Sequence, residues 1–157
     1  MSSPWFEEAF GAHYPVLYAH RDEAEAERCL DLLPRLAPLS GPEGGPILDL
    51  GCGDGRHLDR LAEGGHRAVG LDLSAALLEV ARNRRAAGMA LSLVRGDMRR
   101  LPFANGAFAS VLSLFTAFGY FATDAENAAV IAGVRRTLTR GGRYMLYSLN
   151  TEQVRST

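Results

Sequence analysis

The sequence contains no lysine, so all 17 of its basic residues are arginines. Its only cysteines, Cys29 and Cys52, are too few for a disulfide scaffold and do not have the spacing of a metal site, so no bound metal is predicted. A formal net charge of −1 excludes a general attraction to nucleic acid or to an anionic membrane. No apolar run approaches the roughly 20 residues that cross a bilayer. The first residues also lack the basic and apolar regions of a secretory signal. We therefore expect a cytoplasmic protein with neither nucleic-acid nor membrane partners.

The composition is that of a packed domain, because 47% of the 157 residues are hydrophobic and 22% are charged. An irregular aromatic stretch is followed by an amphipathic helix predicted over 21–37. The apolar face of this helix is expected to contain Ala24, Cys29, Leu32, Leu33 and Leu36. We divide the chain into an N-terminal lid segment with its helix, residues 1–40, and a ligand-binding domain, residues 41–157.

Strand and helix patterns alternate from residue 47 onward. Apolar stretches predict five strands at 47–51, 68–74, 91–97, 109–115 and 143–150. The intervening patterns predict helices at 56–65, 75–88 and 125–140, with Ser74 and Thr123 at helix starts and Gly141 and Gly142 at the last helix end. This alternation predicts an α/β, Rossmann-like, doubly wound fold: a mostly parallel sheet of order 3-2-1-4-5 with helices on both faces.

Three glycines at alternate positions, Gly51, Gly53 and Gly55, follow the first predicted strand. In an open parallel sheet, ligands bind beyond the carboxyl ends of the strands. The helix that follows the glycines directs its N–H groups and the positive end of its dipole into that space. We therefore expect this loop to turn tightly and to hold an anionic group against bare backbone.

Acids follow the next two predicted strands. Asp72 comes 21 residues after Gly51, close to the roughly 20 residues at which an acid reaches ribose hydroxyls. Asp97 follows the third strand, where a carboxylate can accept a hydrogen bond from the amine of adenine, and Met98 can contact the ring. The ligand implied by these positions has an anionic end, a ribose and a base.

The stretches ILDLGCGDGRH, VGLDLS, VRGDMRRLPF and VLSLFTAFGYF, in this order between about residues 45 and 150, resemble the motifs of class I S-adenosylmethionine-dependent methyltransferases of the small-molecule type. The resemblance implies S-adenosyl-L-methionine as cofactor and methyl transfer by in-line displacement. It implies that Asp49, Gly51 and Gly53 line the methionine portion, that Asp72 holds the ribose, and that Leu114 and Phe115 complete the wall. The full cofactor site implied in this way is Tyr14, Asp49, Gly51, Cys52, Gly53, Asp72, Leu73, Asp97, Met98, Leu114 and Phe115.

Two other functions were weighed. An NAD(P)-dependent oxidoreductase would carry the pattern G-x-G-x-x-G, but Arg56 stands at the third glycine position and Asp54 places a negative charge where a pyrophosphate would lie. This alternative is disfavoured. A non-catalytic module that binds S-adenosylmethionine or a partner remains an alternative, because a fold does not determine a function.

The sequence indicates less about the methyl acceptor than about the cofactor. An N/D-P-P-Y-like stretch, typical of DNA and protein nitrogen methylases, is replaced by SLFTAFGYF, whose aromatic residues indicate an apolar pocket for a small-molecule acceptor. No catalytic residue is assigned. The candidates are His13, Tyr14, His57 and Tyr120. For the histidines, we expect a structural or surface role rather than a catalytic one.

The resembled fold continues with a sixth and a seventh strand, whereas here TEQVRST follows the fifth predicted strand. We expect the 157 residues to belong to a longer protein, and to bind the cofactor but turn over slowly or not at all. The exposed edge of the fifth strand could otherwise pair with a second copy in a homo-oligomer.

Overall fold

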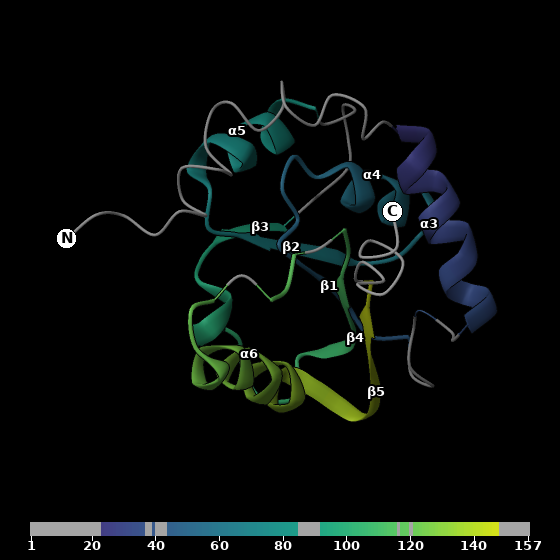
Figure 1. Ribbon diagram of the computed structural model, residues 1–157. Coiled ribbons are helices and arrows are strands. Elements are labelled where there is room, and N and C mark those ends of the chain that lie inside the picture. The colour runs from purple at the N-terminus through teal and green to yellow at the C-terminus, as the bar shows by residue number, and fades with distance from the viewer. Residues whose placement is uncertain are drawn as a thin grey trace, which may run out of the picture.

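The computed structural model describes residues 23–36, 39, 44–84, 92–115, 117–119 and 121–147. These residues form one parallel sheet of order β3-β2-β1-β4-β5, as predicted (Figure 1). The strands are β1 (Ile47–Leu50), β2 (Ala68–Asp72), β3 (Ser92–Arg95), β4 (Phe108–Ser113) and β5 (Leu138–Leu146). The helices are α3 (Glu23–Leu36), α4 (Arg56–Glu63), α5 (Ala75–Asn83), α6 (Asp124–Thr137) and a short 3-10 helix, η1 (Met98–Arg100). Helices cover both faces of the sheet: α3, α4 and α5 lie on one side and α6 on the other (Figure 1).

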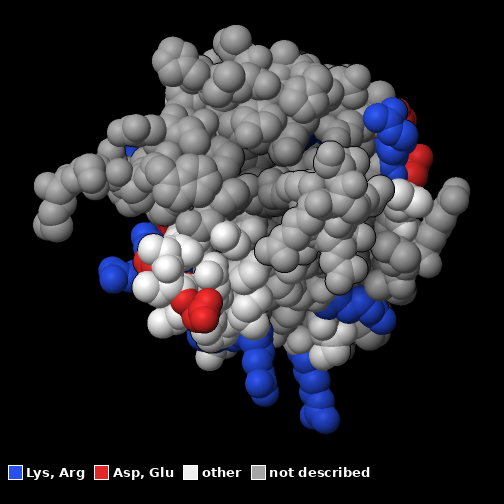
Figure 2. Space-filling view, viewed as in Figure 1, with Lys and Arg blue, Asp and Glu red and all other residues white. Residues whose placement is uncertain are grey.

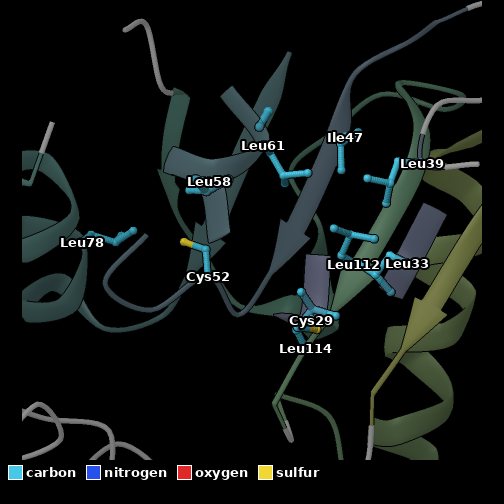
Figure 3. Packing of buried hydrophobic residues seen from close by; sticks show 11 residues of the cluster. Cys29, Leu33, Leu39, Ile47, Cys52, Leu58, Leu61, Leu78, Leu112 and Leu114 are labelled. Atoms are coloured by element: carbon cyan, nitrogen blue, oxygen red, sulfur yellow. The ribbon is translucent and has the colours of Figure 1, made fainter. Parts of the chain in front are cut away.

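The two faces of the sheet are covered by separate hydrophobic clusters. Ile47 and Leu112 belong to the cluster on the side of α3, α4 and α5, together with Leu33 and Leu58 of those helices (Figure 3). Their strand neighbours Leu48 and Val111 point the other way and pack with Val130 and Val134 of α6. Because alternate strand residues face opposite sides of a sheet, a strand covered on both faces must be apolar at nearly every position. This explains why β4 is buried along its whole length.

Local sequence sets the starts of two helices, as predicted. The Ser74 hydroxyl accepts a hydrogen bond from the backbone N–H of Leu77 at 3.3 Å and caps α5. Thr123 and Glu126 form a reciprocal capping box at the start of α6. The helix predicted over residues 75–88 ends earlier in the structure, at Asn83. Residues 85–88 lie outside the described residues. Within the described parts of the chain, no helix combines the length and the apolarity needed to cross a membrane.

The buried face of α3 differs from the prediction at one position. Ala26, Cys29 and Leu33 are buried, whereas Leu32 is 55% exposed. The three buried residues follow one another at intervals of three and four, which defines a single helix face, and Leu32 lies off that face. The prediction for Leu32 was therefore wrong. The side chains of Ala24 and Leu36 lie outside those that the structure describes.

The junction between α6 and β5 also differs from the prediction. The helix ends at Thr137, and the strand begins at Leu138 rather than at residue 143. Leu138 pairs with Phe108 but Arg143 pairs with Ser110, so β5 carries extra residues opposite β4. Gly141, with a φ of +77°, lies in this irregular part of the strand. The glycine pair therefore accommodates a bulge in β5 and does not end the helix.

Candidate functional site

A cavity of about 370 Å³ lies at the carboxyl ends of β1 to β4. Of the cofactor-site residues predicted from the sequence, the cavity is lined by Asp49, Gly51, Cys52, Gly53, Asp72, Leu73, Asp97, Met98, Leu114 and Phe115. His57 lines it as well, whereas His13, Tyr14 and Tyr120 lie outside the described residues. Residues from four separate loops thus meet where the topology of a parallel sheet places a ligand.

The three glycines of the loop after β1, Gly51, Gly53 and Gly55, differ in what an added side chain would contact. All three have a positive φ, between +54° and +81°. A Cβ on Gly51 would lie 2.7 Å from the Cβ of Ala117, and a Cβ on Gly55 would lie 2.9 Å from the Cβ of Ala81. A Cβ on Gly53 would meet nothing closer than a Leu77 methyl at 4.0 Å. The expectation that all three expose backbone to a ligand therefore holds best for Gly53, because Gly51 and Gly55 are also approached by the protein's own side chains.

Asp72 connects the end of β2 to the glycine loop. Its Oδ2 accepts the backbone N–H of Gly53 and its Oδ1 accepts that of Ser74, both at 2.8 Å. Burial raises the pKa of Asp72 more than these two hydrogen bonds lower it. An ionised carboxylate offers about four acceptor positions, so Asp72 can accept about two more donors in the cavity that it lines. Two adjacent ribose hydroxyls would match this capacity.

Asp97 is held by one residue, Arg99. The Asp97 carboxylate accepts the backbone N–H of Arg99 at 2.8 Å, its Nε at 2.9 Å and its Nη2 at 2.6 Å. Burial raises the pKa of Asp97, but the hydrogen bonds and charge of Arg99 outweigh that effect and the pKa is lowered. Three donors on about four acceptor positions leave room for about one more. A single donor, such as one N–H of the adenine amine, would fill the remaining acceptor position.

Asp49 is a buried acid at the end of β1. The side chain is 1% exposed, and Oδ2 has no hydrogen-bond partner among the described residues. Burial, reinforced by the charge of Asp72, raises the pKa of Asp49 to about 7, against the opposing effect of Arg56. A buried carboxyl group without a partner is costly unless a ligand supplies one. A ligand ammonium group would be such a partner.

Aromatic and cationic side chains form the wall opposite the acids. Phe115 has a φ of +50° and is the one non-glycine residue with a positive φ in the described ranges. Its ring stacks on the His57 ring at 5.2 Å, and the guanidinium of Arg56 lies 5.3 Å from its centre. Burial and the charge of Arg56 lower the pKa of His57 to about 3, so this histidine is neutral at pH 7. Because α4 begins after Gly55, which has no side chain to cap it, the first-turn N–H groups beside Arg56 suit an anion.

Several residues of the site could not be found by reading motifs. Arg99 holds Asp97, Phe121 lines the cavity, and Arg84 pairs with Asp54 at 3.4 Å across the outer side of the glycine loop. Each depends on contacts between segments distant in sequence, or on a side-chain direction that spacing does not specify. Cys52 lines the cavity, but burial raises the pKa of its thiol, so it is a neutral packing residue.

The geometry accommodates a ligand with an amino-acid end, a ribose and a base, and comparison with known proteins points to the same ligand. Residues 47–142 match the family model described as a methyltransferase domain. The chain is 32% identical to the dTDP-3-amino-3,4,6-trideoxy-alpha-D-glucopyranose N,N-dimethyltransferase of Streptomyces venezuelae, over 82% of this chain and 52% of that protein. It is 35% identical to the 18S rRNA (guanine-N(7))-methyltransferase of Mus musculus, over 82% of this chain and 47% of that protein. The chain thus spans about half the length of these relatives.

Solved structures show the same likeness. An S-adenosylmethionine-bound amino pentose methyltransferase from Micromonospora echinaspora superposes with a TM-score of 0.64 at 31% identity, covering 87% of this chain and 57% of that one. The protein DesVI of Streptomyces venezuelae gives a TM-score of 0.66 at 32% identity, covering 87% and 56%. S-adenosylmethionine, which is bound in that amino pentose methyltransferase, is the cofactor of this chain as well. The chain therefore belongs to the S-adenosylmethionine-dependent methyltransferase family.

Proposed function

We propose that this protein transfers a methyl group from S-adenosylmethionine to a small-molecule acceptor. The observation that carries the proposal is the convergence of Asp49, Asp72 and Asp97 on one cavity, each with acceptor capacity left for a ligand. The bound cofactor supplies a methyl group activated by the sulfonium. The protein's own task is to hold the two reactants in line and to keep water away from them.

Each part of the cofactor has a matching group in the proposed site. Asp49 accepts the ammonium, and the N-terminal turn of α4 with Arg56 receives the carboxylate. Asp72 accepts the two ribose hydroxyls, whereas Asp97 accepts one N–H of the adenine amine. Met98 and Leu73 line the cavity and would pack against the base, and Leu114 and Phe115 would form the wall of the methionine end.

A small acceptor is supported by the shape and chemistry of the rest of the cavity. Beyond the acids, the lining includes the apolar side chains of Phe115, Phe121 and Ala117 and a neutral His57, together with Arg56 and Arg95. Such a surface favours a compact organic acceptor over a charged polymer. Two relatives are named as methyltransferases of nucleotide-linked amino sugars, which are small molecules.

RNA is the competing acceptor, because other relatives are named as 18S rRNA methyltransferases. RNA binding depends on a concentration of basic side chains around the site. Figure 2 shows basic side chains at separate places on the described part of one face, some of them beside acidic ones. The formal net charge of −1 adds no general attraction to a polyanion. A small acceptor is therefore the better-supported proposal.

The test measures binding first and transfer second. Calorimetry with S-adenosylmethionine and S-adenosylhomocysteine reports cofactor binding without an acceptor. Methyl-labelled cofactor is then incubated with excess protein, so that a single slow turnover is still counted, together with nucleotide-linked amino sugars or with a ribosomal RNA fragment. Label in a sugar supports the proposal, and label in the RNA alone contradicts the small acceptor. Cofactor binding without transfer to either would leave the small acceptor unsupported, and it fits both the non-catalytic module and the slow turnover expected of a chain that spans about half the length of its relatives.

Cofactor affinity is expected to fall below pH 7. The ammonium group needs an ionised Asp49, whose pKa is raised to about 7 by burial and by Asp72. At pH 6 roughly a tenth of this carboxyl is ionised, so S-adenosylhomocysteine should bind about tenfold more weakly than at pH 8. Calorimetry between pH 6 and 8 measures the change.

The control for this profile is Asp49→Asn, which cannot titrate and should bind weakly with little dependence on pH. The pH dependence of the fold's stability has the opposite sign to the pH dependence of cofactor binding. A carboxyl whose pKa is raised by folding stabilises the ligand-free fold at low pH, and this contribution is lost as the pH rises through 7. A wild-type affinity that stays constant from pH 6 to 8 would remove Asp49 from the ammonium site.

A further inference from the structure

Arg99 contacts three segments, two of which line the cavity. It follows Asp97 at the end of β3, it pairs with Glu126 in the first turn of α6, and its guanidinium lies 4.8 Å from the ring centre of Phe121. Asp97 and Phe121 both line the cavity. One side chain therefore fixes two parts of the lining that come from different loops.

The hydrogen bonds of Arg99 determine how Asp97 can meet a ligand. The guanidinium Nε lies 3.1 Å from Oδ1 and 2.9 Å from Oδ2, and Nη2 lies 2.6 Å from Oδ2. This two-pronged contact fixes the plane of the carboxylate, which the backbone N–H of Arg99 alone would leave able to rotate. Glu126 holds the guanidinium from the opposite side, and Glu126 is itself anchored by the hydroxyl of Thr123 at 3.0 Å.

We infer that Arg99 is a positioning residue that orients the Asp97 carboxylate to accept one N–H from the base, and thereby selects a 6-amino purine over a 6-oxo purine. This inference rests on the proposed function. A 6-oxo purine presents a carbonyl oxygen in place of the amine, and two acceptors facing each other repel. The discrimination is strong only if the carboxylate cannot turn away, which is the condition that Arg99 imposes. The contact of its guanidinium with the Phe121 ring keeps the neighbouring wall in place as well.

The experiment compares S-adenosylhomocysteine with S-inosylhomocysteine, which carries a carbonyl where adenine has its amine. Calorimetry gives the ratio of their affinities for the whole chain. The wild type is expected to prefer the adenine form roughly 10- to 100-fold, as for a hydrogen bond to a charged group. In Arg99→Met the preference should fall below about threefold. Arg99→Lys should fall in between, because an ammonium is a point charge on a flexible stem and lacks the rigid planar fork that fixes the carboxylate plane.

Matched variants separate positioning from general stability. Arg136 holds the backbone carbonyls of Leu101 and Phe103 near the same region, and neither of these residues lines the cavity. Arg136→Met should lower the melting temperature and leave the affinity ratio unchanged. Phe121→Leu should weaken binding of both nucleosides by the same factor, because it alters the wall and not the acid.

The outcomes distinguish this inference from the proposed function. A wild type that binds neither nucleoside overturns both. A wild type that binds both forms equally, or an Arg99→Met variant that keeps or increases the preference, overturns the role of Arg99 and leaves the methyltransferase proposal standing. If Arg99→Met does not fold, an unchanged ratio in Arg99→Lys has the same meaning, and a lowered ratio supports the inference.

Discussion

Replacing Asp72 with alanine is expected to weaken the binding of S-adenosylhomocysteine by about 3 kcal/mol, roughly 150-fold, because two hydroxyl groups lose a charged acceptor. The same substitution removes the partner of the Gly53 and Ser74 N–H groups. An unsatisfied buried N–H costs about 1–3 kcal/mol. Since burial raises the pKa of Asp72, its removal also relieves a desolvation cost, and the loss of stability should lie near the low end of that range. Calorimetry measures the affinity and urea unfolding measures the stability.

Glu79→Ala is the matched control for this variant. Glu79 is an exposed acid on α5 that pairs with Arg82 at 3.1 Å, away from the cavity lining. Such surface pairs contribute about 0–1 kcal/mol, so both affinity and stability should stay close to those of the wild type. Wild-type affinity in Asp72→Ala would show that the ribose is not held by the acid at the end of β2.

Gly53→Ala is expected to separate binding from folding. The new methyl group meets only a Leu77 methyl at 4.0 Å, so the fold bears little more than the cost of a left-handed alanine, about 1–2 kcal/mol. Gly53 lines the cavity, however, so we expect the added methyl group to take up space where the ligand would pack against the backbone. Overpacking of this kind costs about 2 kcal/mol, so S-adenosylhomocysteine should bind roughly 30-fold more weakly.

Gly65→Ala supplies the comparison. Gly65 has a φ of +79°, has nothing within 4 Å of an added Cβ, and lies in the turn after α4, outside the cavity lining. It should therefore lose about as much stability as Gly53→Ala and bind the cofactor normally. Equal affinities in the two alanine variants would mean that the ligand does not approach residue 53.

Sequence patterns predicted the sheet order and the five strands well because both depend on local chemistry, although each predicted strand runs one to four residues past its observed end. The apolar runs of β1 and β4, the hydroxyl caps at Ser74 and Thr123, and the acids that follow the strands are all readable from neighbouring residues. The misplaced start of β5 has a different origin. A glycine pair can end a helix or permit a bulge, and only pairing with β4 decides between these two outcomes.

The site was predictable in its acids and not in the partners of those acids. Spacing along the chain placed Asp72 and Asp97 beside the cavity, but it did not show that Asp97 is held by Arg99. Nor could it show that burial raises the pKa of Asp49 to about 7, because burial is a property of the packed fold. The positive φ of Phe115 is likewise invisible in a sequence, since phenylalanine carries no preference for that conformation.

The contact between Gly51 and Ala117 limits how this site can change. A Cβ at residue 51 would lie 2.7 Å from the Ala117 methyl, so two of the smallest residues meet where the loop after β4 crosses the end of β1. A bulkier residue at either position would push apart the glycine loop after β1 and the loop after β4 that carries Phe115. Divergence toward new acceptors must therefore keep these two residues small and proceed through other lining residues, such as Phe115 and Phe121.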